Sequence, residues 1–392
     1  MLSKLYLLVI CLIGFFSCIK EVAGPNSLAG IKLDSIVPTV ARVGDTVKVF
    51  GGDFSQLTEA AIAINSDTAQ IIASSSGEIT FIIRSPFRSG KLRLIINADT
   101  LDGPFIEYRY LAKVTTVAGT GSASFSDGPG GSAAFNCPWG LTMDKYSRLL
   151  VADSYNRAIR KIDFTNPTEP IVTSESPGSL DFYAPYNLAV DTIDNTLFVT
   201  DFNQHVLKVT PSGVMSAMSP ATLVTSTGVA IGPDRMVYIS DNTQHGIIKM
   251  DQNGGNISDV TRSVFTARTV VFDAKGQLYT INSHVMKVNP DGTLHHFPQE
   301  VLLPGWDFVI DTDGNFIQAD HFSNRIQKVN RATGKITIIA GSGAAMDQDG
   351  TGLQASFNGP MSLVFDKAGN IYVSTYNFDT GEGNKIRKIT FE

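Results

Sequence analysis

Aromatic residues recur at one position of an internal repeat, and their type and spacing point to ligand binding. Trp139, Tyr186 and Trp306 each stand at the start of an apolar run. Arg268 takes this position in another copy, and Asp307 directly follows Trp306. Aromatic rings stack on the C–H face of a sugar, polar neighbours bond its hydroxyls, and an arginine can pair with the carboxylate of an acidic sugar. The nominated ligand-binding residues are Trp139, Tyr186, Arg268, Trp306, Asp307, His321, Tyr155 and Tyr376. The alternative is that these aromatics only plug the central channel.

Signatures of catalysis and metal binding are weak by comparison. The chain has no Gly-x-Ser-x-Gly elbow, no His-Glu-x-x-His, no zinc-spaced cysteine pair and no phosphate-binding loop. His205 and His245 fall where another repeat copy has Arg157, so we expect them to be structural. His321, which follows Asp320, is the candidate for a general base. We therefore predict no catalytic residue, no cofactor and no metal ion.

The composition favours a folded β protein and excludes nucleic acid as a partner. Apolar residues make up 43% of the 392 residues and charged residues 17%, which is compatible with a large buried core. The 35 glycines and 17 prolines suit a turn-rich β fold. The net charge of −6 leaves no basic face of the kind that phosphate backbones require.

Six copies of one pattern occupy residues 112–392 and must position the aromatic residues. In the first copy, apolar runs at 138–144 and 149–153 are followed by an alternating run at 156–162. The aspartates that mark the first turn of each copy are Asp144, Asp191, Asp234, Asp273, Asp311 and Asp366. Repeats of roughly 40–50 residues with short strands are typical of propeller blades, so an all-β, six-bladed β-propeller is predicted.

The ring is predicted to close with a strand from its N-terminal end. The last copy has no fourth strand of its own, whereas the sequence around 113–119 repeats at 336–341, an offset of 222 residues. The match continues from Asp127 to Asp349 and from Pro138 to Pro360. The segment near 113–119 should therefore complete the last blade, which removes the two open sheet edges.

Residues 1–18 have the pattern of an export leader. Lys4 precedes a 12-residue apolar run at 5–16, too short for a stable bilayer span, and Ser17-Cys18 follows. This arrangement resembles a bacterial lipobox, which implies lipidation of Cys18, a tether at 19–30, and an exported protein anchored in the outer membrane, facing the surface or the periplasm. The alternative is a simple signal peptide cut elsewhere, with Cys18 incidental.

Residues 31–111 predict a small β-sandwich ahead of the propeller. Short alternating runs are separated by glycine, serine, aspartate and proline. Pro38, Gly44, the Gly51-Gly52-Asp53 turn, Pro86 and Tyr108 resemble the TIG (IPT) immunoglobulin-like domain. That resemblance implies a spacer or binding module without catalytic groups.

The repeats themselves resemble those of NHL-repeat propellers. The resemblance rests on an Ala-Gly-x-Gly…Asp-Gly…Phe-Asn-x-Pro stretch that begins at Ala118, and on the Asp-x-x-Asn-Arg-x-Ile-Arg-Lys-Ile run that begins at Asp153. It covers nearly all of 112–392, and the fourth copy is degenerate, with Asn282 where an aspartate is usual. It implies a six-bladed fold but no single function.

Three functions remain open at this point. The domain order resembles accessory lipoproteins of starch-utilisation-like glycan uptake systems, which implies a non-catalytic protein that binds polysaccharide or oligosaccharide, contacts the membrane through its lipid anchor and has an outer-membrane protein as a candidate partner. Some NHL propellers are lyases, but these need a histidine with an acid or a metal at the channel mouth, where this chain offers His321 alone. The third function is a protein-binding scaffold, which would spread exposed apolar residues over a broad face.

Overall fold

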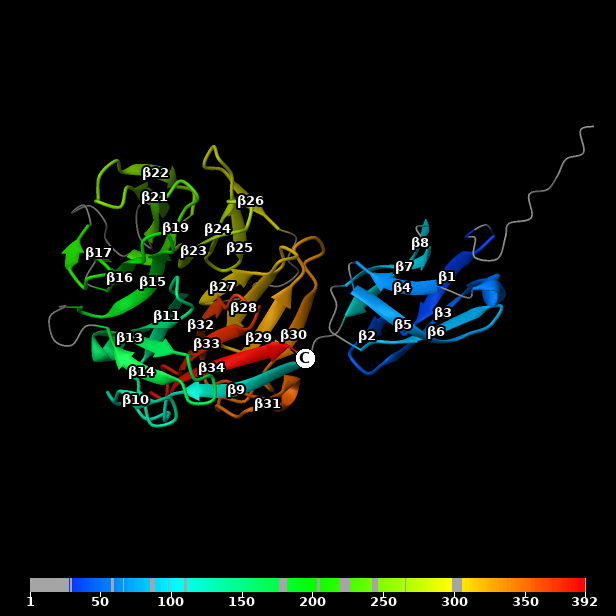
Figure 1. Ribbon diagram of the computed structural model, residues 1–392. Coiled ribbons are helices and arrows are strands. Elements are labelled where there is room, and N and C mark those ends of the chain that lie inside the picture. Colours follow the sequence, from blue (N-terminus) through cyan, green and yellow to red (C-terminus); the bar gives the residue numbers. More distant parts are fainter. Residues whose placement is uncertain are drawn as a thin grey trace, which may run out of the picture. The chain divides into compact units, whose positions relative to one another are not determined.

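The chain forms two compact units, Met1–Tyr110 and Leu111–Glu392, and the regular structure of both is almost entirely β (Figure 1). The structure is a computed structural model. It describes residues 28, 30–57, 60–65, 67–84, 89–97, 99–108, 111–175, 182–202, 205–218, 226–241, 246–264, 266–297 and 305–391. The leader, Cys18, nearly all of the tether, Pro86 and His245 lie outside these residues. No helix in the described segments is long and apolar enough to cross a membrane.

The first unit is a small immunoglobulin-like β-sandwich. Its strands are β1 (Lys32–Val37), β2 (Val40–Ala41), β3 (Thr46–Gly52), β4 (Ala60–Ile64), β5 (Asp67–Ser74), β6 (Glu78–Ile82), β7 (Gly90–Ile96) and β8 (Asp99–Tyr108), with the short 3-10 turn η1 (Phe54–Gln56). They pair in the order β1-β3-β6-β5-β4-β7-β8-β2. The first half of β5 pairs with β4 and its second half with β6, so this strand passes from one layer to the other. The alternation in β3, with Val47 and Val49 buried and Lys48 exposed, puts its apolar face into the core between the layers.

The second unit is a six-bladed propeller, and the first three blades follow the chain. Blade 1 contains β11 (Pro138–Met143), β12 (Leu149–Asp153), β13 (Ala158–Asp163) and β14 (Ile171–Ser174), with β10 (Gly128–Pro129) at its edge and the turn η2 (Ser154–Asn156) after β12. Blade 2 contains β15 (Pro185–Asp191), β16 (Thr196–Asp201), β17 (His205–Val209) and β18 (Met215–Ala217). Blade 3 contains β19 (Ser226–Ile231), β20 (Val237–Asp241), β21 (Gly246–Met250) and β22 (Ser258–Thr261).

The remaining blades complete the ring. Blade 4 contains β23 (Thr269–Phe272), β24 (Leu278–Ile281), β25 (Val285–Val288) and β26 (Leu294–His296). Blade 5 contains β27 (Asp307–Ile310), β28 (Phe316–Asp320), β29 (Arg325–Val329) and β30 (Ile336–Ala340). Blade 6 contains β32 (Pro360–Phe365), β33 (Ile371–Tyr376), β34 (Gly383–Phe391) and β9 (Ala112–Ala118), with β31 (Gly350–Thr351) at its edge and η3 (Gly352–Gln354) before β32.

Closure of the ring by the N-terminal strand is confirmed. β9 pairs antiparallel with β34, Val114 opposite Ile389, and Figure 1 shows it between β34 and β31. The innermost strands contact one another in the order β11, β15, β19, β23, β27 and β32, and β32 contacts β11. Closure pairs strands that lie more than 260 residues apart in the chain.

Both faces of each blade are packed, which explains why the second strand of most copies reads as a continuous apolar run. All five residues of β12 are buried, and the same is true of β20 and β28. The marker aspartates cap turns as their sequence predicts: Asp144 Oδ1 accepts hydrogen bonds from the backbone N–H groups of Tyr146 and Arg148, at 2.9 and 2.8 Å. These turns set the register of strands 1 and 2 in each blade.

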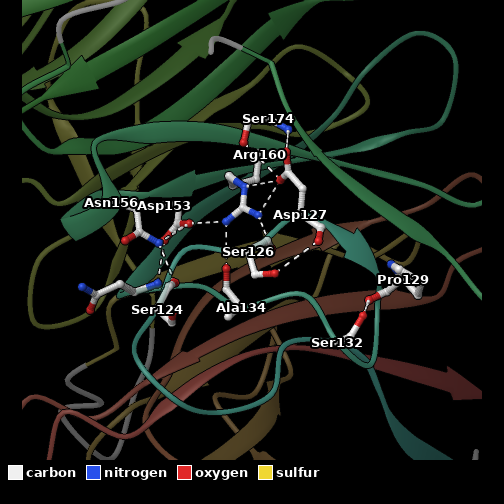
Figure 2. A network of polar contacts seen from close by, with 11 residues as sticks. Ser124, Ser126, Asp127, Pro129, Ser132, Ala134, Asp153, Asn156, Arg160 and Ser174 are labelled. Carbon is white, nitrogen blue, oxygen red and sulfur yellow. Dashed lines mark hydrogen bonds and ion pairs between the residues drawn. The ribbon is translucent and has the colours of Figure 1, made fainter. Parts of the chain in front are cut away.

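A fully buried arginine attaches the long loop between β9 and β11 to blade 1 (Figure 2). Arg160 on β13 lies 2.7 Å from Asp153 Oδ2 and 2.7 Å from Asp127 Oδ1. It also donates to the backbone carbonyls of Ser126 and Ala134, at 2.6 and 2.9 Å. The guanidinium is thus fully hydrogen-bonded where water cannot reach it, which is the condition for a buried charge.

Blade 6 also has a buried arginine paired with two aspartates, but one of the aspartates comes from a different position. Arg387, also fully buried, pairs with Asp347 and Asp349 at 2.8 and 2.9 Å. Asp349 matches Asp127 at the 222-residue offset, but Thr375 stands where blade 1 has Asp153. The second carboxylate therefore comes from the loop instead of the strand.

Candidate ligand-binding face of the propeller

The nominated aromatic residues lie at one end of the propeller, which we call the mouth. Trp139 and Tyr186 occupy the second position of β11 and β15, and Trp306 directly precedes β27. Because Pro138 pairs with Asp153 and Pro185 with Asp201, the starts of the inner strands lie at the same end as the turns that follow each second strand. Inner strands of a propeller line its central channel, so these side chains surround the opening.

A tight aromatic cluster occupies the centre of the mouth. The ring of Trp139 lies 4.1 Å from that of Tyr186 and 5.4 Å, edge to face, from that of Trp306. Phe378 packs against both tryptophans, at 5.2 and 5.9 Å. Both tryptophans are partly exposed, whereas Tyr186 is buried, so the indole rings form the accessible part of the cluster.

Two buried polar atoms of the mouth have no hydrogen-bond partner among the described residues, Trp306 Nε1 and His321 Nδ1. The two rings are 5.9 Å apart, edge to face. Burial is the largest influence on His321 and lowers its pKa below the usual 6.5, so the imidazole is neutral at pH 7. Hydrogen bonding to the Pro360 and Gly359 backbone and the charges of Asp379 and Asp320 oppose this shift more weakly. Buried polar groups are normally paired, so these two atoms are exceptions within the mouth.

Arg268 reaches the same cluster from blade 4. Its guanidinium lies 4.4 Å from the centre of the Trp306 ring, and Nη1 donates to the carbonyl of Gly305 at 3.3 Å. Stacking on an indole leaves the edge of the guanidinium available for an acceptor.

Asp307 is not brought to the surface of the mouth. Its carboxylate is buried and accepts hydrogen bonds from Ser362 Oγ at 2.6 Å and from the backbone N–H groups of Leu363 and Phe308, at 3.2 and 2.9 Å. Burial raises the pKa of Asp307, and these hydrogen bonds oppose the shift. The residue links blade 5 to β32 of blade 6, so its role here is structural.

The rim of the mouth carries exposed aromatic residues from equivalent turns. Tyr155 is 55% exposed and lies against Tyr376, with ring centres 5.7 Å apart. Phe202 and Phe322 are each 62% exposed, and Phe378 is 40% exposed. Phe378 escaped the sequence analysis because the turn after β33 is longer than its counterparts; aligning the six turns would have revealed an aromatic there.

The mouth has no grouping typical of a metal centre or a thiol nucleophile. The part of the chain that the structure describes contains no group of three or more histidine, cysteine, aspartate or glutamate residues arranged to hold a metal ion. Cys137 lies in the floor beneath the tryptophans, and burial, followed by the charge of Asp153, raises the pKa of its thiol. It is therefore an unreactive packing residue.

Sequence comparison finds a similar curated protein from a plant. No protein-family model matches the sequence. Protein SUPPRESSOR OF QUENCHING 1, chloroplastic, from Arabidopsis thaliana is 23% identical over an alignment of 316 residues, and the match covers 71% of this chain. The chain spans 28% of the length of that curated relative.

Solved structures similar to this chain share its fold. A Bacteroides thetaiotaomicron protein of unknown function has a TM-score of 0.65 at 18% identity, and an auxiliary nutrient binding protein from Bacteroides ovatus has a TM-score of 0.58 at 20% identity; both matches cover 92% of this chain and 98% of the other. A streptogramin B lyase, with a TM-score of 0.52 at 13% identity, covers 72% of this chain and 98% of its own. The propeller unit alone, Leu111–Glu392, is about 72% of the chain, so the two Bacteroides matches also cover part of the sandwich.

Proposed function

We propose that this protein is an exported, non-catalytic lipoprotein that binds a carbohydrate at the mouth of its propeller and serves as an accessory to glycan uptake at the outer membrane. The observation that carries the proposal is the central cluster of Trp139, Tyr186 and Trp306 with two buried, unpartnered polar atoms beside it. Sugars provide both the apolar face and the hydroxyls that such a site would bind.

Export and anchoring rest on residues 1–18. The apolar run that ends at Ser17-Cys18 supports lipidation of Cys18, and the following residues would tether the folded units to the membrane. The similar Bacteroides ovatus structure is described as an auxiliary nutrient binding protein, which supports a binding role of this kind.

A lyase is the second candidate, because a streptogramin B lyase shares the propeller fold. His321 is neutral at pH 7 and would be the base. The buried Asp307 carboxylate cannot be the matching acid, since it is committed to Ser362 and the backbone. Asp379 and Asp320 are the carboxylates whose charges act on His321. The exposed rim residues Tyr155, Phe202 and Phe322 keep a protein-binding scaffold as a third candidate.

Binding is tested with residues 19–392, which retain every described residue. Neutral and acidic polysaccharides are titrated while tryptophan emission is followed, since both tryptophans of the chain lie at the mouth. The test variant is Trp139→Ala with Trp306→Ala, measured by calorimetry because it lacks the fluorophores. The matched control is Tyr146→Ala, whose ring is 63% exposed at the turn between β11 and β12, the opposite end of the blade.

A saturable response to one polysaccharide class that the double variant loses and Tyr146→Ala keeps would support carbohydrate binding at the mouth. Circular dichroism and the urea midpoint confirm that each variant is folded. If no polysaccharide binds, or if the double variant binds as well as the parent chain, the proposal is wrong and the lyase and scaffold functions become the leading candidates.

A further inference from the structure

Two histidines of blade 4 lie side by side at a site that the proposed function does not use. His284 follows β24 and His296 ends β26. His284 Nε2 is 3.2 Å from His296 Nδ1, and the ring centres are 5.3 Å apart. The strand register explains the pairing: Met286 is opposite His296, and His284 is two residues from Met286, so these three side chains share one face of the blade.

The distance between the two nitrogens matches the spacing of two ligands on one metal ion. At bond lengths of about 2.0–2.1 Å, adjacent imidazole nitrogens of a tetrahedral zinc site are about 3.3 Å apart. His284 Nδ1 lies 3.0 Å from Ser283 Oγ. When the Nδ1–H group of His284 donates a hydrogen bond to this hydroxyl, Nε2 carries the lone pair and faces His296. Metal-binding histidines have this ring orientation.

This turn also departs from the repeat. In four blades an aspartate ends the second strand or directly follows it; these residues are Asp153, Asp201, Asp241 and Asp320. Blade 4 has Asn282 there, and Asn282 Oδ1 accepts from Ser283 Oγ, the hydroxyl that faces His284. The histidines therefore add a chemical grouping to blade 4 that the scaffold does not require.

From this geometry we propose that His284 and His296 form a binding site for a divalent transition-metal ion such as Zn²⁺, Ni²⁺ or Cu²⁺, with water as the remaining ligands. Metal binding places the ion between Nε2 of His284 and Nδ1 of His296, and the proton that joins the two nitrogens moves to the other nitrogen of His296 or to solvent. Imidazole ligands favour these ions over Mg²⁺, which prefers oxygen.

The test is calorimetric titration of untagged residues 19–392 with ZnCl₂ and NiCl₂, and with MgCl₂ as the control ion. The variants are His284→Gln and His296→Gln. The control is His295→Gln, because His295 is opposite Lys287, on the other face of the same strand. His296 is exposed, so its variant should fold even if the half-buried His284 does not tolerate replacement.

We expect saturable binding of Zn²⁺ or Ni²⁺ that EDTA reverses, that is weakened roughly tenfold or more in either test variant, and that His295→Gln leaves unchanged. Absence of saturable binding would overturn the proposal, and so would an equal loss in His295→Gln. These outcomes are independent of carbohydrate binding, which is measured at the mouth residues.

Discussion

Removing the buried guanidinium of blade 1 should destabilise the propeller strongly. In Arg160→Met, the carboxylate of Asp153 stays fully buried without its cation, and the carbonyls of Ser126 and Ala134 lose their donor. Breaking a buried ion pair by removing one partner costs about 3–5 kcal/mol, because the remaining charge is neither solvated nor paired. We expect a loss of that size in the free energy of unfolding.

Urea denaturation followed by tryptophan emission reports on the unfolding of the propeller. Trp139 and Trp306 are the tryptophans of the chain, and both lie in the propeller, so unfolding of the sandwich does not contribute. The control is Arg262→Met. The ion pair of Arg262 with Asp259 is exposed, with 66% and 42% of the side chains accessible, so its loss should cost no more than about 1 kcal/mol.

A second variant separates the buried charge from lost packing. Adding Asp153→Asn to Arg160→Met removes the unpaired carboxylate, so the double variant should be more stable than Arg160→Met alone. The reasoning would be refuted if Arg160→Met cost no more than Arg262→Met, or if Asp153→Asn gave no recovery in the Arg160→Met background.

Three further outcomes are expected. Burial holds the pKa of His321 in the folded chain below 6.5, so the unfolded chain binds this proton first and stability decreases as the pH falls below about 6.5. The urea midpoint should therefore change less between about pH 7.5 and 5.5 in His321→Gln than in the parent chain, and an equal change in both would contradict this. Gly119→Ala should cost about 1–3 kcal/mol, because φ is +102° and the new Cβ would lie 2.5 Å from the carbonyl oxygen of Asn384, whereas Gly131→Ala, with nothing within 4 Å, should be near neutral in the same urea assay. Cys137, the one cysteine of residues 19–392, should react with a thiol reagent only when the propeller unfolds, and rapid labelling in native buffer would show that the floor of the mouth opens.

Much of the fold could be predicted because its signals are local and periodic. Strand runs, turn aspartates and the 222-residue internal match lie directly in the sequence, and blades 1 to 5 each form from neighbouring residues. Closure by β9 was predictable for the same reason, since the N-terminal strand duplicates the outer strand of blade 5. The leader, the lipidation of Cys18 and the TIG and NHL assignments stay predictions.

The candidate site was predicted in part. Repeat alignment placed the tryptophans and Tyr186 at equivalent strand starts, and the ring geometry of a propeller then brings them together. The orientation of Asp307 could not be predicted, because its hydrogen-bond partners Ser362 and Leu363 lie 55 and 56 residues away on another blade. Phe378 was missed because it lies in a turn whose length breaks the repeat.

The sequence by itself determined the number of blades, the strand that closes them and the end of the propeller at which the aromatic residues gather, because these follow from a repeated local pattern. Only the tertiary structure decided which polar groups are satisfied. It placed the Asp307 carboxylate against blade 6, left Trp306 Nε1 without a described partner, and set His284 and His296 at 3.2 Å. Such outcomes depend on the relative positions of side chains from different strands and blades, to within less than an ångström, and no local pattern encodes them.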